Sequence, residues 1–210
     1  MSEGVRRSVK PARRTQAERR SGSARGLVQA AIMVVAQEGV GAVTFDSVGR
    51  QAGFSRGLAS QHFGSKQGLI EAVIEHLQAR EAARLAEIDV DAMPGLEAVL
   101  AYVDMALADM AGKGEGQAYV KLLSSAVAEG ADMRATFAAN HAKVQDHLAG
   151  MLRKGQVDGT VRPEIDCDAT ALMIGCLLFG FSMQLLVDPS MEIEPLRQIG
   201  LSSLRRSVSA

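Results

Sequence analysis

The chain has 210 residues, of which 47% are hydrophobic and 22% are charged, a balance that permits a buried core and excludes a disordered chain. Only 4% of the residues are aromatic and tryptophan is absent, whereas alanine, leucine, methionine and glycine are abundant, which favours packed helices over a β-sandwich. Two cysteines exclude a disulfide scaffold, and no apolar signal-peptide segment follows the basic N-terminus. We expect a soluble, helical protein of the cytoplasm.

The formal net charge of −1 hides an uneven distribution of charged residues. Residues 1–66 contain eleven Lys/Arg and four Asp/Glu, whereas residues 67–210 contain twelve Lys/Arg and twenty Asp/Glu. A basic N-terminal third on an acidic body predicts a polyanionic partner at one end of the molecule. Residues 1–22 have no apolar period, so we expect a basic disordered arm that binds in a DNA minor groove or to phosphates without specificity.

Three predicted helices follow this arm, in residues 23–66. Each begins after a Ser or Thr that can cap its first turn, and Gly53 supplies the left-handed backbone of a sharp turn between the second and third. Two short helices joined in this way are typical of a helix-turn-helix module. The predicted helices are Ala24–Glu38 after Ser23, Phe45–Ala52 after Thr44, and Arg56–Phe63 after Ser55. The apolar side chains expected in their core are Phe45, Val48, Ala52, Phe54 and Phe63.

The sequence from Phe45 to Lys66 resembles the DNA-binding domain of the TetR family of transcriptional regulators. The similarity extends over residues 24–75, and its close matches are Ala52-Gly53, Ser55, Gly57 and Phe63-Gly64-Ser65-Lys66, with His62 before them. This chain departs from the family pattern at Gly49, Leu58, Ala59 and Ser60, where Ala, Thr, a larger aliphatic residue and Tyr are common. The resemblance implies an all-α fold of about nine helices. A three-helix helix-turn-helix domain (residues 23–66) would precede a larger effector-binding and dimerisation domain (residues 67–210).

The third predicted helix is expected to lie in the major groove of double-stranded DNA and to read base edges. Arg56 can read guanine and Gln61 can read adenine, each with about 1–3 kcal/mol of discrimination. Lys66 is placed to bind the DNA backbone, while His62 either contacts a phosphate or packs beside Phe63. The candidate DNA-binding residues are Thr44, Ser55, Arg56, Gly57, Ser60, Gln61, His62 and Lys66.

The remaining residues form a second series of predicted helices, separated by glycine-rich breaks. Residues 171–187 carry no charge, but they are shorter than the roughly twenty residues of a membrane span, so we expect a buried helix and no membrane partner. One face would meet the core, and the other would join the last helix in a four-helix homodimer interface, which the resemblance also implies. Two reading heads would then bind a pseudo-palindromic operator. The predicted helices are 66–85, which Ser65 can cap, 95–111, 117–129, 133–156, 167–187 and 192–207.

Apolar, aromatic and polar side chains of this second series could line a pocket for a small effector. Side chains of these types at helical spacing are also ordinary core residues, and the sequence leaves both interpretations open. The pairs His141/His147 and Cys167/Cys176 do not share a helix face, so we expect neither a metal site nor a cofactor. The candidate ligand-binding residues are Tyr102, Met105, Met110, Tyr119, Leu123, Phe137, His141, Met173 and Leu177.

No Ser/His/Asp or Cys/His arrangement, phosphate-binding glycine loop or HExxH motif is present, so we expect no enzyme. The sequence favours a TetR-like repressor whose affinity for DNA is lowered by a small, largely apolar effector. The alternative is a DNA-binding architectural or cell-division factor on the same scaffold, without a small-molecule switch. A response to ligand would discriminate the two, and activation in place of repression stays open.

Overall fold

The computed structural model describes residues 15–111, 114–129 and 131–210. Within these ranges the chain folds into nine α-helices and two short 3₁₀ helices, Val40–Ala42 and Val90–Ala92, which confirms the all-α prediction. The α-helices are α1 (Gln16–Glu38), α2 (Phe45–Ala52), α3 (Arg56–Phe63), α4 (Lys66–Glu87), α5 (Gly95–Ala111), α6 (Glu115–Glu129), α7 (Ala131–Asp158), α8 (Cys167–Val187) and α9 (Ile193–Val208).

The starts of α2, α3 and α4 lie where the capping residues predict them. The side chains of Thr44, Ser55 and Ser65 accept hydrogen bonds from the backbone N–H groups of Ser47, Leu58 and Gly68 at 3.0, 3.2 and 3.0 Å. These bonds satisfy donors that the first helical turn leaves without a partner. Gly53 ends α2 with φ 71°, the left-handed conformation expected of the turn.

Helix α1 begins at Gln16, earlier than the predicted Ala24, so residues 16–22 are helical although we assigned them to a disordered arm. Ser23 lies inside α1 and is not its N-cap, since its hydroxyl donates to the carbonyl of Arg20 at 2.9 Å. The prediction failed because it required an apolar stripe, whereas alanine, glutamine, glutamate and arginine favour helix without one. The rest of the predicted arm, residues 1–14, lies outside the described residues.

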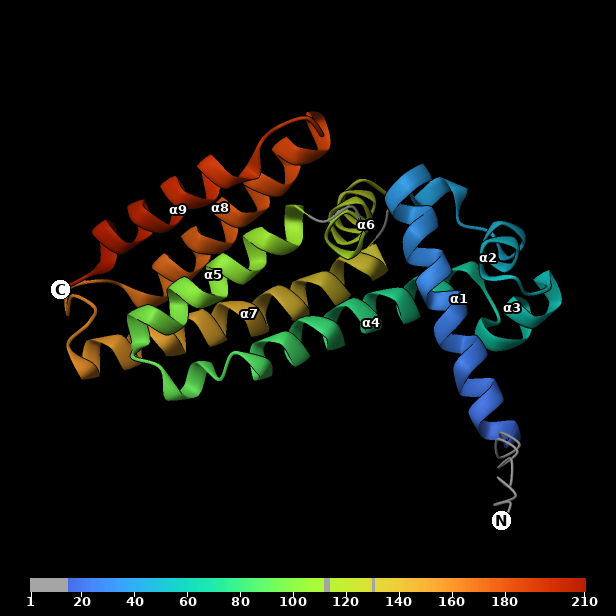
Figure 1. The fold of residues 1–210 in the computed structure, drawn as a ribbon, viewed down its shortest axis with the longest axis horizontal. Coiled ribbons are helices and arrows are strands. Elements are labelled where there is room, and N and C mark those ends of the chain that lie inside the picture. Colours follow the sequence, from blue (N-terminus) through green and yellow to red (C-terminus); the bar gives the residue numbers. More distant parts are fainter. Residues whose placement is uncertain (1–14, 112–113, 130) are drawn as a thin grey trace, which may run out of the picture.

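The apolar core has two parts, and the division between them does not follow the chain order. One part joins α1, α2, α3 and α4 to buried residues of α6 and to Phe137 of α7. The other joins α5, α7, α8 and α9. Figure 1 shows α6 end-on between α1 and the body, with α4 extending from the N-terminal helices along one side. Helices α4 and α6 therefore connect the two ends of the molecule.

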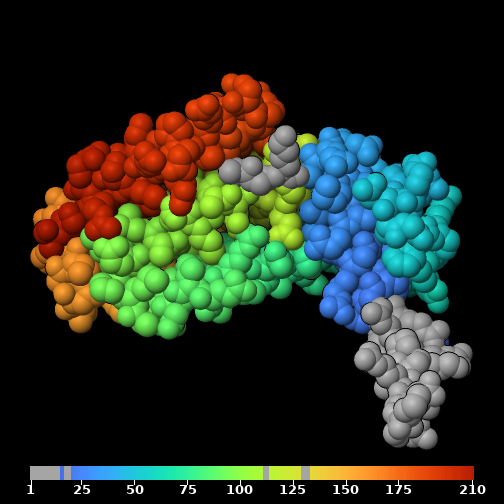
Figure 2. Space-filling view, viewed as in Figure 1, coloured from blue at the N-terminus to red at the C-terminus, as the bar shows by residue number. Residues whose placement is uncertain are grey.

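Helices α8 and α9 lie along one outer edge of the body, as Figures 1 and 2 show. Among the described residues, α8 alone is long and apolar enough to cross a membrane by length and composition, and 22% of its most apolar window is buried. Met173 and Leu177 of α8 are 50% and 37% exposed, and Ile199 of α9 is 62% exposed. This edge thus presents apolar side chains that the described residues do not cover.

Candidate DNA-binding surface and ligand cavity

Helix α3 has one buried face and one exposed face. Ala59 is completely buried, and its small side chain lets α3 pack closely on the core that joins α1, α2, α3 and α4. Arg56, Gly57, Ser60 and Gln61 are all exposed. Their spacing in the sequence places them on one side of the helix. The structure therefore brings these four predicted DNA-binding residues together on one surface.

Arg56 and Lys66 make no ion pair with any described residue, so their charges are open to an external anion. Arg56 is the first residue of α3, and Lys66 is the first residue of α4. Thr44 and Ser55 are also exposed, and their hydroxyl oxygens serve as helix caps. The exposed N-terminal turns of α2, α3 and α4 present backbone N–H groups that suit phosphate oxygens.

His62 is half-buried and connects α3 to α1. Its Nε2 lies 2.8 Å from the hydroxyl oxygen of Ser23, and its ring is tilted against Phe63 with 5.9 Å between centroids. This packing corresponds to the structural alternative for His62 that the sequence left open. Phe54, which we predicted in the core, is 36% exposed; it lies in the turn before α3 and packs against Gly26, where an added Cβ would be 3.2 Å from the ring.

A cavity of about 870 Å³ lies between α4, α5, α6, α7 and α8. Its volume is in the range of small-molecule sites, about 300–1,000 Å³. Seven of the nine predicted ligand-binding residues line it: Tyr102, Met105, Met110, Tyr119, Leu123, Phe137 and His141. Met173 and Leu177 do not line it and are instead 50% and 37% exposed on α8. These two were selected for their apolarity, but α8 is apolar on all sides, so the sequence does not show which face is inward.

Polar groups inside the cavity form two hydrogen-bonded clusters. Tyr102 donates from its hydroxyl to Glu81 Oε1 at 2.9 Å. The Tyr119 hydroxyl lies 3.3 Å from Asn140 Nδ2 and 3.1 Å from His141 Nε2. Burial, with a smaller contribution from the negative charge of Glu81, raises the pKa of Tyr119 to about 12 and that of Tyr102 further. Both phenols therefore stay neutral hydrogen-bonding groups around neutral pH.

Ion pairs and hydrogen bonds connect the cavity wall to α1. Glu115 lies within 4 Å of Arg80, Arg84 and His76, and His76 Nε2 is 2.8 Å from Gln29 Nε2 of α1. Arg84 also pairs with Asp109. A second connection runs through α6, where Lys121 donates to the α1 carbonyl of Ala36 at 2.6 Å.

Sequence reasoning missed Glu81, Asn140 and the ion pairs because most of the candidates that it selected were apolar or aromatic, and none was a carboxylate or an amide. A signal for Glu81 was present, since it lies four residues after Leu77 and so continues the buried stripe of α4 with a carboxylate.

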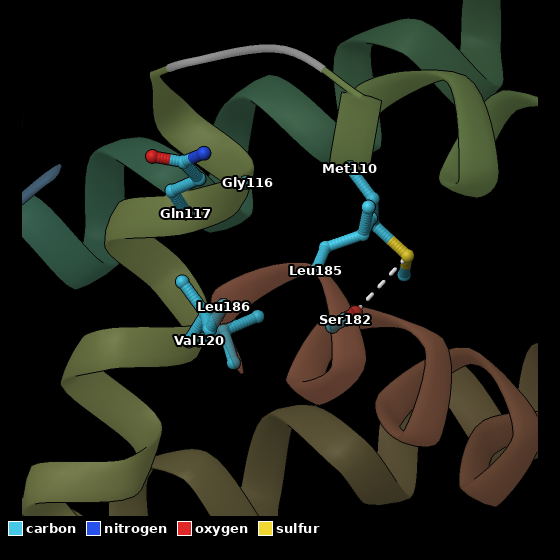
Figure 3. A pocket seen from close by; sticks show the side chains of 7 residues that line it. All are labelled: Met110, Gly116, Gln117, Val120, Ser182, Leu185 and Leu186. Atoms are coloured by element: carbon cyan, nitrogen blue, oxygen red, sulfur yellow. Dashed lines mark hydrogen bonds between the residues drawn. The ribbon is translucent and has the colours of Figure 1, made fainter. Parts of the chain in front are cut away.

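A second, much smaller pocket of about 10 Å³ lies between α5, α6 and α8, and Figure 3 shows the side chains around it. The Ser182 hydroxyl donates a hydrogen bond to the sulfur atom of Met110 at 3.0 Å. This volume holds about one water molecule, so it is no site for an organic ligand. Among the described residues, no group of three His, Cys, Asp or Glu side chains is placed to hold a metal ion.

Comparison with known proteins gives matches of two kinds. Residues 27–73 match the family of bacterial regulatory proteins called the tetR family. The HTH-type transcriptional regulator BetI of Paraburkholderia phymatum is 37% identical over 51 residues, which are 24% of this chain and 26% of BetI. The alignment thus spans about a quarter of the length of that curated relative.

Solved structures match over nearly the whole chain. A TetR-family regulator from Rhodococcus sp. is similar with a TM-score of 0.74 and 23% identity, over 88% of this chain and 97% of that one. A transcriptional regulator from Saccharomonospora viridis, in complex with choline, is similar with a TM-score of 0.75 and 20% identity, over 90% and 99% of the two chains. At these identities the structural matches establish the fold. Residues 27–73 thus resemble the DNA-binding domain of the tetR family, and the chain as a whole shares the fold of these regulators.

Proposed function

We propose that this chain represses transcription by binding a specific operator through α3, and that a small molecule in the cavity releases it. The exposed face of α3, with Arg56, Ser60 and Gln61, is the observation that carries this proposal, together with Lys66 at the start of α4, which pairs with no acidic side chain of the described residues. Arg56 and Gln61 would read base edges, while Lys66, Thr44 and Ser55 would hold phosphates. Reading by side chains on a fixed helix requires no cofactor.

The same proposal includes a homodimer formed through α8 and α9. The exposed apolar side chains Met173, Leu177 and Ile199, which do not line the cavity, would become buried against a second copy. A dimer would also place two α3 helices on successive major grooves, about 10 base pairs apart, on a pseudo-palindromic site.

Light scattering after size exclusion tests this interface. The unmodified chain should have the mass of a dimer, and Met173→Glu should reduce it to the mass of a monomer. Val157→Glu is the control, because Val157 is 90% exposed on α7, outside the α8–α9 edge. A monomer before substitution, or recovery of the chain with membranes, would contradict the dimer.

The cavity supports release by an effector because part of its wall belongs to the core of the N-terminal helices. Leu77, Leu123 and Phe137 line the cavity, and all three are buried in the core that includes α1, α2 and α3. A ligand that moves these side chains must also move α1 or α4, since a packed core transmits strain. The bound form would favour a spacing of the two α3 helices that does not match the operator.

Fluorescence anisotropy with labelled DNA tests the proposal. The duplex would be the segment next to the chain's own gene, with a scrambled duplex of the same composition as control. We expect binding about a thousandfold tighter to the first duplex, as specific recognition requires. Equal and salt-sensitive binding to both would favour the architectural factor, and no binding at low salt would reject DNA binding altogether.

A further inference from the structure

One carboxylate in the large cavity, that of Glu81, forms no ion pair with another described residue. Glu81 lines the cavity from α4. The other two acidic side chains of the lining, Asp109 and Glu115, pair with Arg84, and Glu115 also pairs with Arg80. The arginines nearest to Glu81 in the sequence are thus already engaged.

Glu81 instead accepts a hydrogen bond from Tyr102, a side chain that is only 3% exposed. A carboxylate next to buried apolar surface is costly unless a positive charge or several donors compensate it. Tyr102 supplies one neutral donor and no positive charge. His141 supplies no compensating charge at neutral pH, because burial lowers the pKa of its imidazole.

Aromatic rings from three helices line the same cavity. They belong to Tyr102 of α5, Tyr119 of α6 and Phe137 of α7. Tyr119 and Phe137 pack edge to face, with 5.4 Å between centroids. The face of an aromatic ring attracts a cation, and more so when the cation is desolvated.

Besides Arg80 and Arg84, the described lining includes the arginine Arg134, which is exposed on α7.

We propose that the cavity binds an organic cation, an ammonium or related onium group on an apolar body, with the positive charge beside Glu81 and the aromatic rings. The apolar body would lie against Met105, Leu123 and Leu148, which line the same space. The inference rests on the proposed effector function and specifies the charge of the effector. It concerns binding alone and includes no covalent step.

Two probes of nearly equal size and opposite charge test this inference, namely tetraphenylphosphonium and tetraphenylborate. Isothermal titration calorimetry gives the affinity of each. Quenching of tyrosine emission places the bound ion in the cavity, because the chain has no tryptophan and its two tyrosines, Tyr102 and Tyr119, both line that space. We expect the phosphonium ion to bind at least about tenfold tighter than the borate, a difference of about 1.4 kcal/mol.

Glu81→Gln removes the charge and keeps an oxygen that can accept from Tyr102. It should remove most of the preference for the cation and leave the borate affinity equal or improved. Glu75→Gln is the matched control, since Glu75 is an exposed residue of α4 that does not line the cavity. Tighter binding of the borate to the unmodified chain would overturn the inference and favour an anionic ligand near Arg134. An unchanged preference in Glu81→Gln would also overturn it.

DNA binding in the presence of each probe separates this inference from the proposed function. A phosphonium ion that binds through Glu81 but leaves the affinity for the specific duplex unchanged supports the cation site and contradicts the switch. Loss of DNA affinity with the borate and not with the phosphonium ion would contradict the cation site and support the switch.

Discussion

The N-terminal helices and the helical body place their functional side chains in different ways. On α3, Arg56, Ser60 and Gln61 are exposed on a rigid surface, and local caps and a glycine turn fix their positions. In the body, Glu81, Tyr102 and Tyr119 converge on one space from three successive helices, α4, α5 and α6, that must first pack against one another. A surface that reads DNA can therefore be built from local sequence, whereas a ligand cavity depends on tertiary packing.

The two regions are nevertheless joined, and a core substitution in the shared part should have the largest effect. Leu122 on α6 is completely buried in the core that contains α1, α2 and α3. Leu122→Ala should lower the free energy of unfolding by about 2–5 kcal/mol and should also weaken DNA binding. Urea unfolding followed by circular dichroism measures the first effect, and anisotropy measures the second.

Leu148→Ala sharpens this comparison, because Leu148 is equally buried but belongs to the other core. Leu148→Ala should lower the free energy of unfolding by a similar amount. Under conditions in which this variant is folded, its affinity for DNA should be nearly unchanged. Val157→Ala, at an exposed position, should change neither quantity. Equal losses of DNA affinity in the two leucine variants would show that the cores do not divide the molecule as described.

Arg56→Ala should have the next largest effect. It removes a side chain that can form two hydrogen bonds with one guanine, so it should weaken specific binding by about 1–3 kcal/mol and relax the preference at one position of each half-site. Anisotropy against a set of duplexes with single base changes measures this loss. Arg153→Ala is the control, since Arg153 is an exposed residue of α7 whose partner is Asp168.

Lys66→Ala should weaken binding to all sequences by a similar factor. Loss of one phosphate contact should reduce the slope of log affinity against log salt concentration by about one. A change of base preference in this variant, without one in Arg56→Ala, would reverse the roles assigned to the two residues.

The smallest expected effect is a shift to higher pH in the alkaline titration of the two cavity tyrosines, Tyr102 and Tyr119. The pKa of Tyr119 is raised to about 12, chiefly by burial, whereas an unfolded chain loses the same proton near pH 10. The protonated Tyr119 phenol therefore contributes fully to the free energy of unfolding below about pH 10, and this contribution is lost as the pH rises toward 12. Tyrosinate absorbance should appear later in the folded chain than in urea. Coincident titrations would show that the two tyrosines are not buried.

Sequence predicted the N-terminal helices well because their signals are local. Thr44, Ser55 and Ser65 cap helices through bonds within three residues, so the sequence alone locates those starts. The extra turns of α1 were missed because their helix propensity comes without an apolar face. In the body, seven candidates reach the cavity, but Glu81 was not among the candidates and Met173 and Leu177 lie outside it. The direction of a side chain on an apolar helix depends on neighbours that no local pattern encodes.

Selection of binding sites from a random pool of duplex DNA tests the central claim most directly. The account predicts enrichment of a pseudo-palindromic sequence with half-sites about one helical turn apart, and relaxation of one base position in each half-site with Arg56→Ala. Recovery of DNA without any enriched sequence, at a salt concentration that permits binding, would contradict sequence-specific reading by α3.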